Sequence, residues 1–198
     1  MLKLKTPFSQ EDILKLNVGD VILVNGTIFT ARDKAHKYLL ENYAEQIKGG
    51  IIYHCGPLVK TINDNMNKRD NNNYIIISAG PTTSSRMNQF TPAIIEKYGI
   101  KAIIGKGGMD SKVLDSIKGR GVYLSAIGGL GALYAKLMKV KCVEKLEFGM
   151  PEAIWELEVK DFPVIVTMDA KENSIYDSVQ QASKKRFLKL IGAKFQGI

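Results

Sequence analysis

A turn rich in hydroxyl side chains carries the strongest chemical signal in the sequence. It reads Ser-Ala-Gly-Pro-Thr-Thr-Ser-Ser-Arg over residues 78–86 and follows an apolar run at residues 74–77. Arg86 lies one helical turn beyond Thr82, so both side chains can share one face of a helix. A guanidinium binds a carboxylate through two parallel hydrogen bonds, and hydroxyl and N–H groups at a helix start bind further oxygens. Thr82, Thr83 and Arg86 are therefore candidate ligands of an anion; the alternative is a capped helix start beside a solvated arginine.

Two further glycine-rich turns follow predicted strands. Lys106 stands between glycines in Gly-Lys-Gly-Gly at residues 105–108. Its small neighbours would let it reach a buried anion; a loop lysine in water is the alternative. The phosphate-loop pattern, with Ser or Thr after Gly-Lys, is absent. The turn Ile-Gly-Gly-Leu-Gly at residues 127–131 lacks the spacing of a dinucleotide-binding fingerprint, so close packing of a helix on a sheet explains it better.

A third group of candidates opens a predicted helix at residue 31. Arg32 is either a second carboxylate ligand or a salt-bridged surface residue, and Asp33 suits a helix N-terminus. His36 either orients Arg32, acts as an acid or base, or is structural. Cys55 follows a histidine, a placement that suits a nucleophile or a metal ligand as well as a structural cysteine, but the sequence has only one other cysteine, Cys142. Two cysteines so far apart cannot cage a cluster, so we expect no metal site in this chain.

Alternating strand and helix patterns surround these turns. Strands are predicted at residues 51–54, 74–77, 101–104 and 122–124, and helices at 31–48, 87–98, 111–117 and 128–140. This alternation predicts parallel strands joined by helices, and hence an α/β fold with residues 74–77 as a central strand. Ligands of open α/β sheets bind at the carboxyl ends of strands, where all three glycine-rich turns fall.

The rest of the chain follows other patterns. Residues 21–24 and 27–30 are predicted to form a hairpin around Asn25-Gly26. Later strands are predicted at residues 143–148, 153–160 and 164–168, and a terminal helix at 174–191 with Lys and Arg on its outer face. The asparagine-rich stretch 63–73 has no periodicity and is predicted to be an exposed loop. Without an internal repeat or a linker, we expect one domain over residues 1–198.

Composition and charge narrow the class of protein. The 198 residues are 45% hydrophobic and 24% charged, and the net charge is +8. No apolar run reaches the roughly 20 residues that span a bilayer, and the first 16 residues lack a secretory pattern, so we expect a cytoplasmic protein without a membrane role. A basic surface in water, an acidic partner or a polyanionic substrate would each account for the charge. Zinc-finger and RNA-binding motifs are missing, so we expect no nucleic-acid role.

Six short motifs follow one another in a specific order. They occupy residues 19–36 (Gly-Asp to Gly-Thr, then Thr-Ala-Arg-Asp with Ala-His), 53–57 (Tyr with Gly-Pro), 80–87 (Gly-Pro-Thr-Thr with Arg-Met), 105–107 (Gly-Lys-Gly), 125–129 (Ser-Ala-Ile-Gly-Gly) and 147–163 (including Glu-Ala-Ile-Trp and Asp-Phe-Pro). In this order they resemble the C-terminal domain of class I fumarases. That family includes the beta subunits of split fumarases and of L-tartrate dehydratases. The resemblance covers about residues 4–169.

The resemblance implies both a fold and a partner. The fold would be a swivelling β/β/α domain with a mixed, largely parallel central sheet. A [4Fe–4S] cluster would be held by three cysteines of a separate alpha region. Because this chain lacks such a cysteine set, it resembles the beta subunit of a two-chain enzyme. Such a subunit would be inactive without its alpha subunit, with which it would form a dimer of heterodimers.

The resemblance also assigns roles to matching residues. Arg32, Arg86 and Lys106 would bind substrate carboxylates or orient the site, with Thr83 and His36 beside them. Thr82 would lie next to the carbon that gains or loses a proton. As a catalytic base, Thr82 would need strong help from its neighbours, because a threonine hydroxyl holds its proton tightly at neutral pH. The Ser-Ser pair at residues 84–85 departs from the family pattern, in which a small residue and glycine are common.

The implied reaction is reversible hydration of fumarate to (S)-malate, with a small dicarboxylate as substrate. Tartrate is the alternative, because fumarate and tartrate differ by hydroxyls that a few contacts discriminate. A non-catalytic anion-binding module would explain the charge and the glycine turns, but it would not require both arginines. A basic nucleic-acid binder would show strongly salt-dependent binding.

Overall fold

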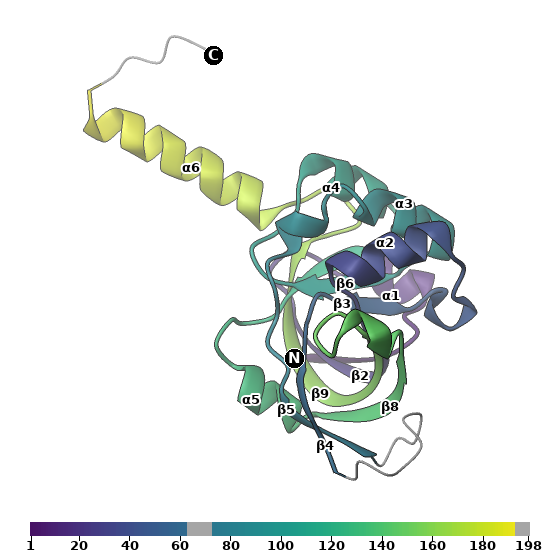
Figure 1. The fold of residues 1–198 in the computed structure, drawn as a ribbon. Coiled ribbons are helices and arrows are strands. Elements are labelled where there is room, and N and C mark those ends of the chain that lie inside the picture. Colours follow the sequence, from purple (N-terminus) through teal and green to yellow (C-terminus); the bar gives the residue numbers. More distant parts are fainter. Residues whose placement is uncertain (63–72, 193–198) are drawn as a thin grey trace.

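A mixed sheet forms the body of the protein in the computed structural model, which describes residues 1–62 and 73–192 (Figure 1). The strand order is β1-β2-β3-β6-β7-β9-β8. The strands are β1 (Leu2–Lys5), β2 (Val21–Thr30), β3 (Ile51–Tyr53), β6 (Ala102–Gly105), β7 (Val122–Ser125), β8 (Met138–Glu144) and β9 (Ile154–Met168). Neighbours from β1 to β7 are parallel, whereas β9 is antiparallel to β7 and β8. Since β9 also pairs with β2, it closes the sheet on itself.

Helices and a small second sheet cover the main sheet. The helices are α1 (Gln10–Lys15), α2 (Asp33–Glu41), α3 (Thr91–Tyr98), α4 (Ser111–Ile117), α5 (Gly131–Ala135) and α6 (Ile175–Leu190). One apolar core lies where α2, α3 and α4 pack on the main sheet, and a second core joins that sheet to α5 and to the pair β4 (Leu58–Thr61) and β5 (Tyr74–Ser78). The predicted α/β class with a largely parallel sheet is therefore confirmed. No helix in the described ranges is long and apolar enough to cross a bilayer.

The prediction that residues 74–77 form a central strand is wrong. They lie in β5, which pairs antiparallel with β4 in a separate two-stranded sheet. Ile76 faces the core, but Ile75 and Ile77 have exposed fractions of 50% and 46%. A short apolar run does not reveal whether one or both faces of a strand are buried. The predicted loop at 63–73 lies almost entirely outside the described residues.

The hairpin predicted at Asn25-Gly26 is also wrong, because β2 continues through it. The register of β2 against β9 shifts between Val24 and Gly26, which is a β-bulge. Gly26 has a φ of +99° there, and Asn25 Oδ1 accepts a hydrogen bond from the Asp161 N–H at 2.9 Å. The two strands predicted at 153–160 and 164–168 are likewise one strand, β9, which carries the extra residue of this bulge between Val159 and Phe162.

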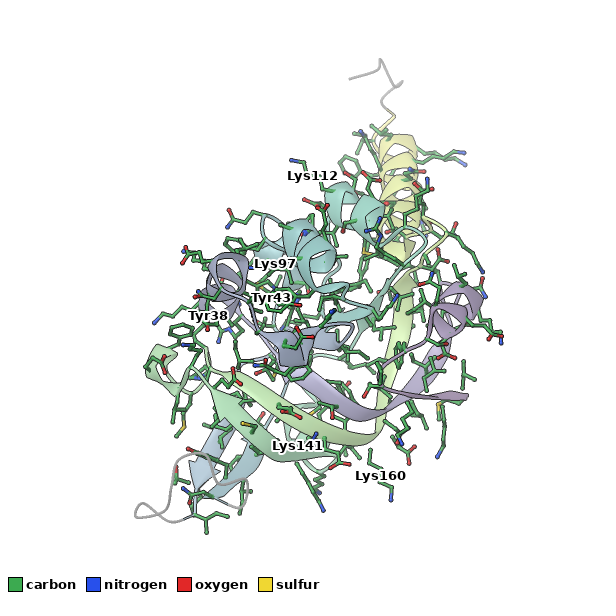
Figure 2. All side chains as sticks on the ribbon, turned by 90° about the vertical axis from the view of Figure 1, so that its right-hand side faces the viewer. Tyr38, Tyr43, Lys97, Lys112, Lys141 and Lys160 are labelled. Atoms are coloured by element: carbon green, nitrogen blue, oxygen red, sulfur yellow. The ribbon has the colours of Figure 1, made fainter. Side chains whose placement is uncertain are left out.

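Three predicted helices are shorter than their sequence patterns. The first ends at Glu41 rather than residue 48, at an extended C-cap, Asn42. The ammonium of Lys97, which is labelled in Figure 2, donates to the carbonyls at this end, including that of Asn42 at 2.7 Å. The second begins at Thr91 with a proline in its first turn. The third, α5, ends at Ala135, and residues 138–140 start β8 instead, so the strand predicted at 143–148 begins and ends earlier. The strands at 51–54, 101–104 and 122–124, the helix at 111–117 and the terminal helix are confirmed.

Candidate functional site

The first two glycine-rich turns lie side by side at the carboxyl ends of β3 and β6. The Thr82 N–H donates to the His54 carbonyl at 2.7 Å, just after β3. The Ser84 N–H donates to the Lys106 carbonyl at 3.0 Å, and Thr83 forms a parallel bridge with Lys106. Backbone hydrogen bonds therefore bring Thr82, Thr83 and Lys106 together, at the edge of the sheet where the sequence predicted a ligand.

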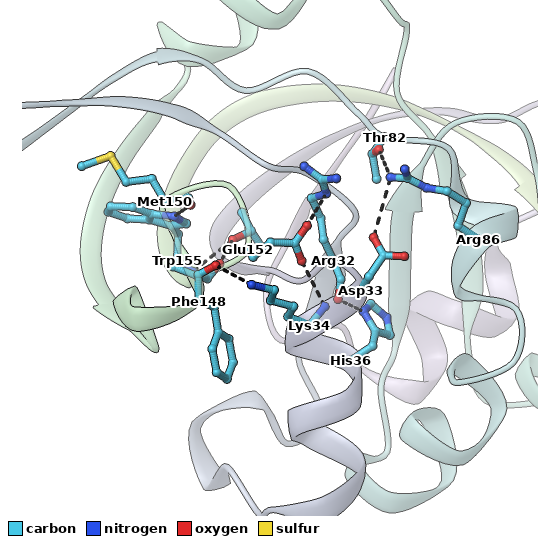
Figure 3. Close-up of polar contacts among 12 residues, drawn as sticks. Arg32, Asp33, Lys34, His36, Thr82, Arg86, Phe148, Met150, Glu152 and Trp155 are labelled. Carbon is cyan, nitrogen blue, oxygen red and sulfur yellow. Dashed lines mark hydrogen bonds and ion pairs between the residues drawn. The ribbon is translucent and has the colours of Figure 1, made fainter.

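Arg86 contacts Thr82 directly. Its Nη2 donates to Thr82 Oγ1 at 2.7 Å, and Asp33 Oδ2 lies 3.9 Å from the same nitrogen (Figure 3). The spacing predicted a shared helical face, but the 3-10 helix spans Ser84–Met87 and Thr82 precedes it, so the two side chains meet without sharing a helix. Asp33 begins α2, so this contact joins the hydroxyl-rich turn to the segment that carries Arg32.

Arg32 is held against a carboxylate from a distant part of the chain. Its Nε lies 3.2 Å from Glu152 Oε1, and this buried nitrogen has no hydrogen bond within the described residues. Glu152 Oε2 accepts from the Lys34 N–H at 3.0 Å (Figure 3). A Cβ at Gly56 would come within 2.7 Å of Arg32 Nη1, which explains the glycine beside Pro57. In the sequence Glu152 is recognisable only as part of a motif, because no neighbouring residue links it to Arg32.

Lys106 is exposed and extends along the third glycine-rich turn. A Cβ at Gly128 would lie 3.7 Å from Lys106 Cδ and 3.9 Å from Nζ. The turn at residues 127–131 was expected only to pack a helix on the sheet. It also borders the Lys106 side chain, so all three glycine-rich turns meet at the candidate site.

His36 lies behind Arg32 rather than at the surface. Its exposed fraction is 1%, and its Nδ1 lies 2.8 Å from the Arg32 carbonyl. A carbonyl only accepts, so Nδ1 carries the hydrogen. Burial lowers the pKa of His36 to about 4, so the ring is neutral at physiological pH. The structure thus favours the orienting role for His36 over direct contact with a substrate.

A buried polar network supports the hydroxyl-rich turn from below. The Tyr123 hydroxyl donates to Ser84 Oγ at 2.9 Å, and Ser84 Oγ lies 2.8 Å from His54 Nδ1. Burial raises the pKa of Tyr123 and lowers that of His54, so both stay neutral near pH 7. A Cβ at Gly105 would overlap the Ser84 hydroxyl. This network is not predictable from the sequence, where its only local sign is isolated polar residues beside apolar strands.

The residues of this chain do not fit an iron–sulfur cluster. Cys55 is fully buried, and burial raises the pKa of its thiol to about 12. Cys142 lies in β8. Within the described residues no group of three or more His, Cys, Asp or Glu side chains is placed to hold a metal ion. What the site offers instead is one hydroxyl bound by the Arg86 guanidinium, with the Arg32 guanidinium and the Lys106 ammonium on neighbouring segments, which suits a small anion with more than one carboxylate.

Comparison with known proteins gives a family match. The model of a family described as "Fumarase C-terminus" matches residues 1–179. A provisionally named class I fumarate hydratase of Geobacillus stearothermophilus is 44% identical over 94% of this chain. A provisionally named L(+)-tartrate dehydratase subunit beta of Methanocaldococcus jannaschii is 42% identical over 93% of this chain, and the L(+)-tartrate dehydratase subunit beta of Escherichia coli is 34% identical over 87%.

The relatives differ in how much of their own length the match covers. This chain spans 35% of the Geobacillus stearothermophilus protein. It spans 95% and 85% of the two subunits named as tartrate dehydratase beta. The same segment therefore occurs both within a longer chain and as a chain of about this length.

Proposed function

The chain belongs to the fumarase C-terminus family, and from this membership we propose that it is the beta subunit of an iron–sulfur-dependent hydro-lyase. The reaction is reversible hydration of fumarate to (S)-malate, in the cytoplasm. The observation that supports the proposal is the hydrogen bond from Arg86 to the Thr82 hydroxyl, with Arg32 and Lys106 on the neighbouring segments. A non-catalytic anion-binding module would not account for the hydrogen bond from Arg86 to Thr82. A nucleic-acid role is not needed to explain the net charge.

The arginines bind the substrate. Arg86 is exposed, so its planar fork can bind a carboxylate while Nη2 stays on Thr82 Oγ1. Arg32 is oriented by Glu152 and by the hydrogen bond that its carbonyl accepts from His36, and its guanidinium binds the other carboxylate. Thr83 and Lys106 pair through their backbones beside Thr82.

Thr82 acts at the carbon that loses or gains a proton. A free threonine hydroxyl is a poor base, because its alkoxide is unstable in water. Here the Arg86 guanidinium donates to Thr82 Oγ1 at 2.7 Å, and such a charge-assisted hydrogen bond strengthens as negative charge develops on the oxygen. Arg86 thus has two roles, holding a carboxylate and lowering the cost of deprotonating Thr82.

The cluster belongs to an alpha subunit in this proposal. The described part of this chain has no ligand set for the cluster, so Thr82, Arg32 and Arg86 act on the substrate and do not bind the cluster. The two subunits close over a shared site by a swivelling motion of this chain, and they assemble as a dimer of heterodimers. The site is then incomplete on either chain alone.

L(+)-tartrate is the second candidate substrate. Two relatives whose length this chain nearly spans are named for it. Tartrate differs from malate by one further hydroxyl, which a single contact in the closed site can select. The residues described above bind the carboxylates, which are common to both substrates.

An anaerobic assay of the reconstituted pair tests the proposal. This chain is mixed with its cluster-carrying subunit after cluster reconstitution; the absorbance of fumarate is followed with malate, and oxaloacetate with tartrate. We expect activity only in the mixture, and the active substrate decides between the two reactions. The control is Lys112→Ala, an exposed lysine in the first turn of α4, which should leave the rate unchanged. A stable, cluster-loaded complex that turns over neither substrate would refute the proposal.

A further inference from the structure

The helix α6 carries an apolar stripe that is uncovered in the described part of the chain. The helix projects away from the sheet and its covering helices (Figure 1), and none of its residues is buried. Val179, Phe187 and Leu190 lie along one side with exposed fractions of 57%, 59% and 78%. Most helical stability in proteins comes from packing such an apolar face, and a lone helix is marginal in water. The stripe is therefore expected to bind a partner.

The first turn of α6 is fixed beside the candidate site. The Tyr176 hydroxyl lies 2.5 Å from Ser125 Oγ, at the end of β7. The Tyr176 ring packs on Gly108, where a Cβ would come within 2.6 Å of the ring. Gly108 closes the turn that carries Lys106. The helix thus starts where the Lys106 turn ends, and it leads away from the site.

The edge of the site next to this anchor is uncovered too. Lys106 and Gly107 are exposed, and Ile127 in the neighbouring turn has an exposed fraction of 57%. A subunit that covers Lys106 would therefore also reach the first turn of α6. The apolar stripe therefore belongs to a helix whose first turn borders the candidate site.

The charge of α6 indicates what kind of partner it fits. Its acidic residue is Asp177, in the first turn, and its basic residues gather in the second half of the helix: Lys184, Lys185, Arg186 and Lys189. Each copy of this helix carries these four cations against one carboxylate, so two copies would repel each other, which disfavours a second copy. The complementary surface is an apolar groove with carboxylates around its rim.

We propose that α6 is the docking helix for the cluster-carrying subunit, which receives the apolar stripe in an acid-rimmed apolar groove. The inference rests on the proposed function, because that function supplies the partner. The family match ends at residue 179, within α6, so most of the stripe lies beyond the matched segment. Through Tyr176 and Gly108, docking of α6 also holds the Lys106 turn against the partner.

Two charge-matched variants on opposite faces test the docking. Val179→Asp places a carboxylate in the stripe, and Gln181→Asp places the same charge on the opposite face, since two residues are about 200° apart on a helix. Both positions are exposed, so neither variant should unfold the chain. The affinity for the purified cluster-carrying subunit is measured by calorimetry, together with hydrogen exchange of α6 with and without that subunit.

We expect Val179→Asp to weaken binding by about tenfold or more and Gln181→Asp by less than about threefold. Affinity should fall as salt rises, and α6 amides should gain protection on binding. Equal affinity of Val179→Asp and the unchanged chain, or no complex at all, would overturn the inference. The inference would also be overturned if α6 amides gained protection on self-association of this chain, or on binding to vesicles of anionic phospholipid, and not on binding to the cluster-carrying subunit. If the complex is active and Val179→Asp does not weaken it, the docking proposal alone is refuted. If the complex is inactive but Val179→Asp disrupts it, the proposed function alone is refuted.

Discussion

Acid should destabilise this protein through its histidines between about pH 6.5 and pH 4. The chain has two histidines, and both His36 and His54 are buried. Burial lowers the pKa of His36 from 6.5 to about 4 and that of His54 well below its usual value. In the unfolded chain both should titrate near their ordinary value. The unfolded state therefore binds protons first, and folding stability is complete above pH 6.5 and lost as pH falls toward the folded-state pKa.

The size of the effect follows from the shift at His36. Each pKa unit corresponds to about 1.4 kcal/mol, so the shift from 6.5 to about 4 amounts to about 3 kcal/mol of unfolding free energy. His54 acts in the same direction. The carboxyls of Asp12, Asp161 and Asp169 have lowered pKa values, so their contributions are lost only at more acidic pH. Their effect is therefore separate from that of the histidines.

Urea unfolding followed by circular dichroism at several pH values measures this dependence. The variant His36→Asn keeps an amide donor for the Arg32 carbonyl but does not titrate. Its unfolding free energy at pH 7.5 should be lower than that of the unchanged chain, since the buried ring is lost. Between pH 7.5 and pH 4, however, its unfolding free energy should fall by about 3 kcal/mol less than that of the unchanged chain. Parallel pH profiles for the variant and the unchanged chain would refute the reasoning, because His36 would then titrate as if exposed.

Three further predictions concern the candidate site and can be tested with the reconstituted pair or with this chain alone. Thr82→Ala should lower kcat by about 100-fold or more while KM changes by less than about threefold; near-normal turnover would remove the base assignment. Arg86→Lys should raise KM about tenfold and also lower kcat, since an ammonium cannot bond Thr82 and fork a carboxylate together; an unchanged KM would argue against carboxylate binding at this position. Gly105→Ala should cost about 1–3 kcal/mol of unfolding free energy by displacing the Ser84 hydroxyl, whereas Gly128→Ala, where a Cβ meets only ordinary contacts, should cost much less in the same urea titration.

Local sequence patterns predicted the parts of the fold that depend on nearby residues. The alternation of strands and helices between residues 101 and 124 and the terminal helix are both observed. Thr82 and Arg86 were expected to meet because they lie four residues apart, and they do. The ordered motifs identified the family, because each keeps its residue types within a few positions.

Tertiary structure decided the contacts between distant residues. Glu152 lies next to Arg32 only because β9 closes the sheet against β2. β5 lies outside the main sheet, although its apolar run resembles that of a buried strand. Packing, and not composition, determines how many faces of a strand are covered. His54, Ser84 and Tyr123 form one network across three elements. Periodicity and spacing describe neighbours along the chain, whereas these pairings depend on how the whole chain packs, and the chemistry of the site depends on them.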